Sequence, residues 1–193
     1  MSTFSLTASQ TVGPFFGPAL LREDAQRNVL TRPETTGERM RIEGRVLDGD
    51  GIPIPDAMVE IWQANAHGRY NHPAGAGQAP LDPSFLGFGR TGTVEDGSYW
   101  FETIKPGSVP FDGAQLQAPH ICVTVFARGL LNHLVTRLYF EDEPANAGDP
   151  VLHLVPDERR ATLLAKREQG GAMVVYRFDI VLQGENETAF FNL

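Results

Sequence analysis

The sequence predicts an all-β fold, an antiparallel β-sandwich that carries an extended N-terminal arm and one short helix. Three observations support this fold class. Short segments with alternating apolar and polar residues begin at residue 40, six to eight such segments follow at roughly regular spacing between Gly- and Pro-rich turns, and a single segment has a helical pattern. We therefore expect two parts, an arm at 1–39 and a sandwich at 40–193.

Composition and charge restrict the class of protein. The 193 residues are 41% hydrophobic and 21% charged, which is enough apolar content for one ordered core. The formal net charge of -8 and the absence of a Lys or Arg cluster argue against a nucleic-acid partner. The sequence contains no run of 18 apolar residues, which argues against a membrane partner. The single Cys122 cannot form an internal disulfide, so we expect a soluble, cytoplasmic protein.

The first half of the chain contains the arm and four predicted strands. The arm lacks a sustained period, so it is expected to pack against something without forming a sheet. Strands are predicted where apolar residues alternate or β-formers accumulate. Gly97 is expected to form the turn of a hairpin between the last two of these strands, which lie at 40–48, 57–64, 88–94 and 99–104.

The second half is predicted to contain three longer strands, at 120–127, 133–141 and 173–182. A helix is predicted at 157–168, because Asp157 follows Pro156 as a cap and an apolar stripe follows. Two loops interrupt the strands. The one at 65–86 is long enough to indicate a function, and a further loop lies at 105–113.

Few side chains are candidates for catalysis or metal binding. The sequence lacks the nucleophile-elbow, zincin, P-loop and dinucleotide-binding motifs. His67, Tyr70 and His72 lie in the long loop, and His120 precedes Cys122 by two positions, which places both on one face of a strand. Each has an ordinary alternative as a solvated histidine, a lid tyrosine or a buried small thiol.

Six segments in order carry a stronger signal. Together they closely resemble the intradiol ring-cleaving dioxygenases over nearly the whole chain. The segments are "VEIWQANAHGRY", "PLDPSFLGFGRTGT", "IKPGSVPF", "PHI", "TRLYFEDE" and "YRFDIVLQGENETAFF".

The resemblance implies a β-sandwich that holds a non-haem Fe(III) through two tyrosinates and an H-x-H pair. Hard phenolates suit a ferric ion, whose charge keeps them deprotonated. Tyr70 and His120 match two of these ligands, but Val109 and Cys122 stand at the other two positions. We therefore expect no metal ligands and no catalytic residues in this chain, and Tyr70 and His120 remain members of a pseudo-site whose ligand, if any, is open.

The resemblance also implies a partner subunit. Protocatechuate-cleaving members consist of two homologous subunits, alpha and beta, and only beta binds the iron. The segment "QTVGPFF" at 10–16 resembles the alpha type, although Phe15 stands where a tyrosine can occur. We therefore expect a hetero-oligomer with a homologous iron-bearing beta subunit, which the arm contacts. It would cleave protocatechuate (3,4-dihydroxybenzoate) with O2 to 3-carboxy-cis,cis-muconate.

In this interpretation the chain contributes part of the substrate pocket and is inactive alone. The matching substrate-binding positions are Thr11, Gly13, Pro14 and Arg128. Gly13 and Pro14 let a rigid backbone approach a flat ring, and Arg128 offers a permanent charge to a carboxylate, unless it only forms a surface ion pair.

Two alternatives are kept open. One is a self-sufficient metal enzyme that uses Tyr70, His120 and Cys122, with His67 or His72 as further ligands. The other is a non-enzymatic β-sandwich that binds a ligand or a protein.

Overall fold

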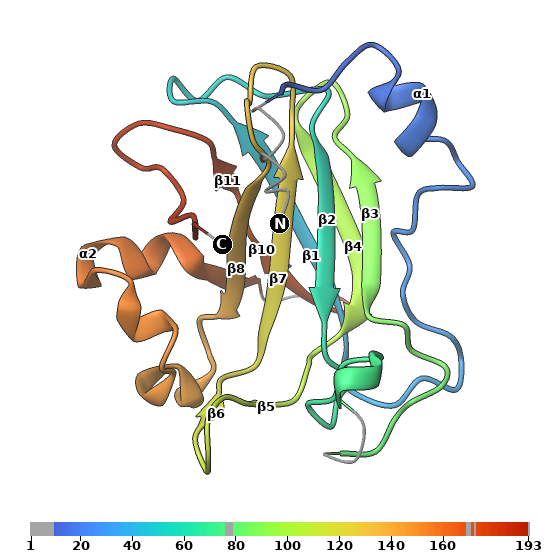
Figure 1. The fold of residues 1–193 in the computed structure, drawn as a ribbon, viewed down its shortest axis with the longest axis vertical. Coiled ribbons are helices and arrows are strands. Elements are labelled where there is room, and N and C mark those ends of the chain that lie inside the picture. The colour runs from blue at the N-terminus through green and yellow to red at the C-terminus, as the bar shows by residue number, and fades with distance from the viewer. Residues whose placement is uncertain (1–9, 76–78, 169–170, 172, 193) are drawn as a thin grey trace, which may run out of the picture.

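Two β-layers face each other in the computed structural model, which describes residues 10–75, 79–168, 171 and 173–192 (Figure 1). The front layer in Figure 1 contains β2 (Met58–Gln63), β3 (Phe88–Gly92), β7 (His120–Phe126) and β8 (Leu134–Phe140). The rear layer contains β1 (Arg39–Leu47), β4 (Ser98–Ile104), β10 (Val174–Arg177) and β11 (Ile180–Val181). The predicted β-sandwich is confirmed.

The core lies between the layers because alternate residues of each strand point inward. In β7 these are Ile121, Val123 and Val125, and in β1 they include Met40 and Ile42, all with exposures of 1% or less. Residues at the intervening positions of β7 therefore lie on the outer face of the front layer, which is where the candidate chemistry of this strand must be found.

The predicted helix at 157–168 is wrong for most of its length. Helix α2 covers Asp157–Arg160 only, a 3-10 turn follows at Ala161–Leu163, and Leu164–Glu168 form strand β9. Leu164 and Ala165 pair with β8 in parallel, and the next residues pair with β10 in antiparallel, so β9 crosses from one layer to the other. Backbone pairing on two sides overrides the local helical pattern, because it satisfies the same hydrogen-bonding groups while burying Ala165.

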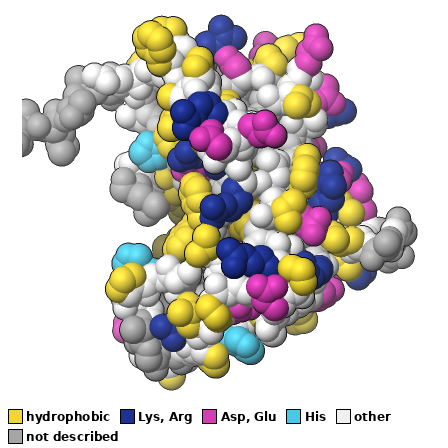
Figure 2. Space-filling model, turned by 90° about the vertical axis from the view of Figure 1, so that its right-hand side faces the viewer, with side chains coloured by type: hydrophobic (Ala, Val, Ile, Leu, Met, Phe, Trp, Pro, Cys, Tyr) yellow, Lys and Arg dark blue, Asp and Glu magenta, His cyan; other side chains and the backbone are white. Residues whose placement is uncertain are grey.

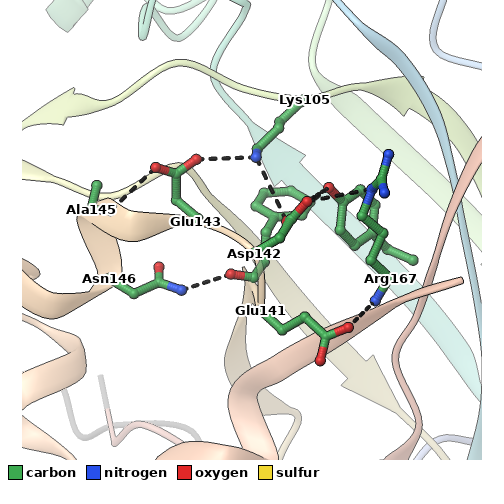
Figure 3. Close-up of polar contacts among 9 residues, drawn as sticks. Lys105, Glu141, Asp142, Glu143, Ala145, Asn146 and Arg167 are labelled. Atoms are coloured by element: carbon green, nitrogen blue, oxygen red, sulfur yellow. Dashed lines mark hydrogen bonds and ion pairs between the residues drawn. The ribbon is translucent and has the colours of Figure 1, made fainter.

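Charged side chains hold this crossing in place. Lys105, after β4, lies 3.1 Å from Glu143 and 3.8 Å from Asp142, and Arg167 of β9 lies 3.4 Å from Asp142 (Figure 3). The hydroxyl of Tyr176 in β10 donates to the same Asp142 at 3.0 Å. Three segments, at the end of β4, in β9 and in β10, are thus tied to one acidic turn.

The predicted hairpin at 88–104 is also wrong, although its turn is correct. Gly97 has φ +75° and its N–H donates to the Val94 carbonyl at 2.8 Å. The flanking strands then separate, since β3 pairs with β2 and β4 pairs with β1. A Cβ added at Gly89 would lie 2.9 Å from the Phe101 ring, so the two strands face each other across the core.

The strand predicted at 173–182 is divided into β10 and β11, both parallel to β1. Between them the Asp179 carboxylate, in place of a backbone carbonyl, accepts the Arg45 N–H at 2.9 Å. The sheet is consequently mixed, although most of its ladders are antiparallel.

The arm runs along the edge where the two layers meet (Figure 1). It contains a short helix that was not predicted, α1 (Phe16–Leu20). It also forms single bridges, from Arg27 to Arg90 of β3 and from Val29 to Glu102 of β4, and it buries Leu30 in the core. The arm therefore adds two isolated sheet contacts where none was expected. Residues 1–9 lie outside the described part.

Short elements lie around the lower end of the front layer in Figure 1. They are the 3-10 turns Pro73–Gly75, Pro144–Gly148 and Leu152–Leu154 and the small ladder of β5 (Val109–Pro110) with β6 (Leu116–Gln117). Within the described residues, no helix has the length and apolarity needed to cross a membrane.

Candidate functional site

Strand register gathers four polar side chains on the outer face of the front layer. In the β7–β8 ladder His120 is opposite Tyr139 and Cys122 is opposite Arg137. Directly opposed residues share a face, so all four side chains point to the same side. Trp62 of β2 is opposite Cys122 and completes this surface.

The loop at 65–86 brings Tyr70 onto that surface. The Asn65 side chain accepts N–H groups of His67 at 2.9 Å and Arg69 at 3.1 Å, which fixes the backbone before Tyr70. Gly68 has φ +76°, and a Cβ there would lie 1.9 Å from the Ser108 carbonyl oxygen, so only glycine lets this loop meet the 105–113 loop.

Tyr70 and His120 are joined by a hydrogen bond of 3.3 Å between the phenol oxygen and Nε2. Nδ1 of His120 lies 2.8 Å from the Ala118 carbonyl and must donate to it, which leaves Nε2 as the acceptor for the Tyr70 hydroxyl. Burial, followed by the charge of Arg137, lowers the pKa of His120 to about 4. The imidazole is therefore neutral at pH 7.

The other two positions that match ligands of the family do not complete a ferric site. Val109 of β5 is buried and has no donor atom. Burial raises the pKa of the Cys122 thiol, and it also raises the pKa of Tyr70. No three His, Cys, Asp or Glu side chains gather into a metal-binding group anywhere in the described residues. We call Tyr70, Val109, His120, Cys122 and Arg137 the pseudo-site, because its donors do not fit iron.

Arg137 is the charged member of the pseudo-site. Its Nη1 donates to the Gln117 side chain at 2.8 Å and lies 3.3 Å from the Tyr139 hydroxyl. That hydroxyl donates to Asp149 at 3.1 Å. Asp149 is fully buried and accepts backbone N–H groups of Ala118, Val151 and Leu152 as well. Gln117, Tyr139 and Asp149 thus hold the guanidinium in place.

A second region lies where the arm meets the end of β7. Here a cavity of about 280 Å³ is lined by apolar side chains and one ion pair. We call it the arm pocket, and its lining residues are Val12, Gly13, Pro14, Phe16, Gly17, Pro18, Leu21, Asp56 and Arg128. Figure 2 shows the side of the molecule along which the arm runs, with basic, acidic and hydrophobic side chains interspersed.

Three of the four predicted substrate-binding residues, Gly13, Pro14 and Arg128, line the arm pocket together. The fourth, Thr11, is adjacent, since its hydroxyl accepts the Gly129 N–H at 3.0 Å. Arg128 is mostly exposed, with 76% of its side-chain surface accessible, and it forms an ion pair with Asp56. Phe15 is 80% exposed and projects from the start of α1.

Neither the packing nor the backbone conformation of the described residues requires a glycine at position 13. A Cβ there would meet no atom within 4 Å, and its φ does not lie in the left-handed region. The open space beside it lies next to an exposed apolar surface, where a ligand or a partner can approach the backbone.

The two regions lie at opposite ends of one strand. β7 runs from His120 to Phe126, so at about 3.3 Å per residue its ends stand roughly 20 Å apart. The arm pocket therefore cannot complete the pseudo-site of its own chain.

Several residues were missed by reading the sequence. Arg137, Tyr139 and Asp56 carry no motif of their own, although Arg137 and Tyr139 alternate within "TRLYFEDE". Their roles depend on which strands pair and in which register. His67 and His72, which were candidates for further metal ligands, are both exposed, and no metal-binding group that includes them forms among the described residues.

Comparison with known proteins gives consistent matches. Residues 11–184 match a family model described as Dioxygenase. The chain is 46% identical to the protocatechuate 3,4-dioxygenase alpha chain of Burkholderia cepacia, with all of both chains covered. It is 41% identical to the beta chain from the same organism, over 87% of this chain and 74% of that one.

Among solved structures, the dioxygenase domain of a carbohydrate-binding fusion protein from Streptomyces sp. SirexAA-E matches with a TM-score of 0.63 and 28% identity. The match covers 96% of this chain and all of that one.

Proposed function

The chain belongs to the intradiol ring-cleaving dioxygenase family, and from that premise we propose that it is the alpha-type subunit of a hetero-oligomeric enzyme that cleaves protocatechuate. The family generally depends on iron, and both alpha and beta relatives exist. In the proposal the homologous beta subunit binds Fe(III), and this chain binds none. The product of ring opening with O2 is 3-carboxy-cis,cis-muconate.

One observation carries the proposal: the chain has a complete family fold with an incomplete ligand set. Val109 offers no donor, the Cys122 thiol is soft and has a raised pKa, and Arg137 brings a positive charge to the same place. We therefore derive no chemical step through iron on this chain. The self-sufficient metal enzyme is the weaker alternative for the same reason.

The arm pocket supports a role in substrate binding. Apolar side chains and the exposed backbone at Gly13 and Pro14 offer a wall for a flat ring, and Arg128 offers a charge-assisted hydrogen bond to a benzoate carboxylate. Thr11 fixes the arm against the β7–β8 turn. Binding at the carboxylate would orient the ring for a reaction at its hydroxyl-bearing carbons.

The location of the arm pocket supports a role in binding a substrate that reacts on another chain. Because it stands roughly 20 Å from the pseudo-site of its own chain, its ligand must react at a centre that another chain provides. We propose that the arm, residues 1–39, contacts the beta subunit there. A cytoplasmic location completes the proposal and rests on the single cysteine.

Expression of the full chain alone and together with a homologous beta chain tests this function. The expected result is no bound iron and no protocatechuate-dependent O2 uptake for this chain alone. The co-purified pair is expected to contain about one iron and to turn over. The beta chain purified alone serves as the control and should show a higher KM. Stoichiometric iron and turnover in this chain without a partner would contradict the proposal.

A further inference from the structure

The position of Arg137 is defined by the ladder that contains the pseudo-site. It is directly opposite Cys122, and it lies two residues from Tyr139, which is opposite His120. Alternation keeps residues 137 and 139 on the same outer face. The guanidinium therefore extends from among the side chains that match the metal ligands of the family.

Arg137 has no carboxylate partner in the part of the chain that the structure describes. Its hydrogen-bonding partners are the neutral Gln117 side chain and the Tyr139 hydroxyl. Among the described residues, no Asp or Glu oxygen lies within 4.0 Å of it; Asp149 is reached only through Tyr139. A half-buried guanidinium that is held by neutral groups keeps its full positive charge.

The same side chain acts on every donor of the pseudo-site. The charge of Arg137 contributes to lowering the pKa of His120, after burial, and it opposes the burial that raises the pKa values of Tyr70 and Cys122. These effects have one origin, a fixed cation beside the three groups, and they agree with the geometry of the ladder.

We infer that Arg137 is a built-in exclusion device of the pseudo-site: its guanidinium takes the place of a metal cation, so that restoring the missing donors does not restore iron binding while this charge remains. A ferric ion would have to bind beside the positive charge of Arg137. The guanidinium cannot move away from the ion, because its hydrogen bonds to Gln117 and Tyr139 hold it in place. Loss of ligands and gain of a cation are then two separate barriers to iron.

This inference goes beyond the proposed function and does not depend on a partner. Every atom that it uses belongs to this chain, so it can fail while the partner proposal holds, and the reverse is equally possible.

The test restores the two donors in the full chain and varies the charge separately. The variants are V109Y/C122H, the same pair with R137Q, and the same pair with R137K. Each is incubated with ferrous iron in air, desalted, and measured for iron content and for the visible absorption of a tyrosinate–Fe(III) centre. We expect about one iron per chain and a visible band with R137Q, and at least about tenfold less iron in the other two.

The lysine variant is the matched control, because it keeps the charge and removes the guanidinium shape. Stoichiometric iron in V109Y/C122H itself would overturn the inference. It would also be overturned if R137K permits iron binding as well as R137Q does, or if the R137Q variant folds, as judged by circular dichroism, and still binds no iron.

Single variants cover the case in which the new tyrosine prevents folding. R137Q and R137K in the otherwise unchanged chain are titrated with Co2+, which reports on Cys122 through thiolate-to-cobalt absorption. We expect this band in R137Q alone. Equal titrations of R137Q, R137K and the unchanged chain would overturn the inference independently of iron.

Discussion

The two ends of β7 use the same strand in opposite ways. At the His120 end, the polar groups are buried or half-buried and form hydrogen bonds inside the chain, from Tyr70 to Asp149. At the Phe126 end, the residues of the arm pocket are exposed or half-buried, and the single charge among the predicted binding residues, Arg128, forms a surface ion pair.

The difference separates stability from function. Polar networks that are buried and satisfied are costly to disturb, whereas exposed pairs contribute little to folding. Changes at the pseudo-site should therefore appear in the free energy of unfolding, and changes at the arm pocket should appear in substrate binding. Each prediction below tests one side of that division.

The largest expected effect is the acid sensitivity of the pseudo-site. Since burial lowers the folded-state pKa of His120 to about 4, below the unfolded value of about 6.5, the unfolded chain takes up a proton first as the pH falls. The free energy of unfolding should then decrease between about pH 6.5 and pH 4, by about 3 kcal/mol from this group. Urea unfolding at pH 7 and at pH 4 measures the decrease.

Two variants assign that decrease to one end of the strand. H120Q, which cannot be protonated, should lose this part of the pH dependence. H133Q is the matched control, because His133 stacks on Phe126 at the other end of β7. If H120Q and H133Q have the same pH dependence as the unchanged chain, the buried histidine is not the source.

The pseudo-site also shows what sequence reading can reach. Tyr70, Val109, His120 and Cys122 were placed together through a resemblance. The structure brings Tyr70, His120 and Cys122 to one ladder, and Val109 pairs with Gln117, whose side chain accepts a hydrogen bond from Arg137. Arg137 could not be found in this way, because its importance arises only from being opposite Cys122. Register depends on the pairing of two strands, and neither strand alone specifies it.

The errors in the fold have the same cause. The turn at Gly97 was correct because its geometry is local, but the hairpin was not, since β3 and β4 belong to different layers. The segment at 157–168 has a helical pattern, yet β9 forms within it because β8 and β10 are available on both sides. Local signals predict turns and alternation well, and tertiary pairing decides the rest.

The next largest effect is expected at Arg128 and concerns function. In the complex with an iron-bearing beta subunit, R128A should lower kcat/KM for protocatechuate by about 30-fold, which corresponds to a charge-assisted hydrogen bond of about 2 kcal/mol. Catechol, which has no carboxylate, should be affected by less than about threefold. Steady-state O2 uptake with both substrates measures the difference.

Iron content and urea unfolding should be unchanged in R128A, because the side chain is exposed. R45A is the control, since Arg45 is another exposed arginine and lies 3.5 Å from Asp96. Equal losses with protocatechuate and catechol would mean that Arg128 supports the interface and does not read the carboxylate.

The smallest effect tests what Asp56 does in the arm pocket. Asp56 already forms an ion pair with Arg128, so a substrate carboxylate must compete with Asp56 for the guanidinium. An exposed pair of this kind is worth about 0.2–1 kcal/mol, so D56N should lower the KM for protocatechuate by a factor between about 1.4 and about 5. D96N, which removes the partner of Arg45, should leave the KM unchanged. A rise in KM for D56N would contradict this prediction. It would mean that Asp56 orients Arg128 toward the ligand, so that the ion pair supports substrate binding and Asp56 does not compete with the substrate carboxylate.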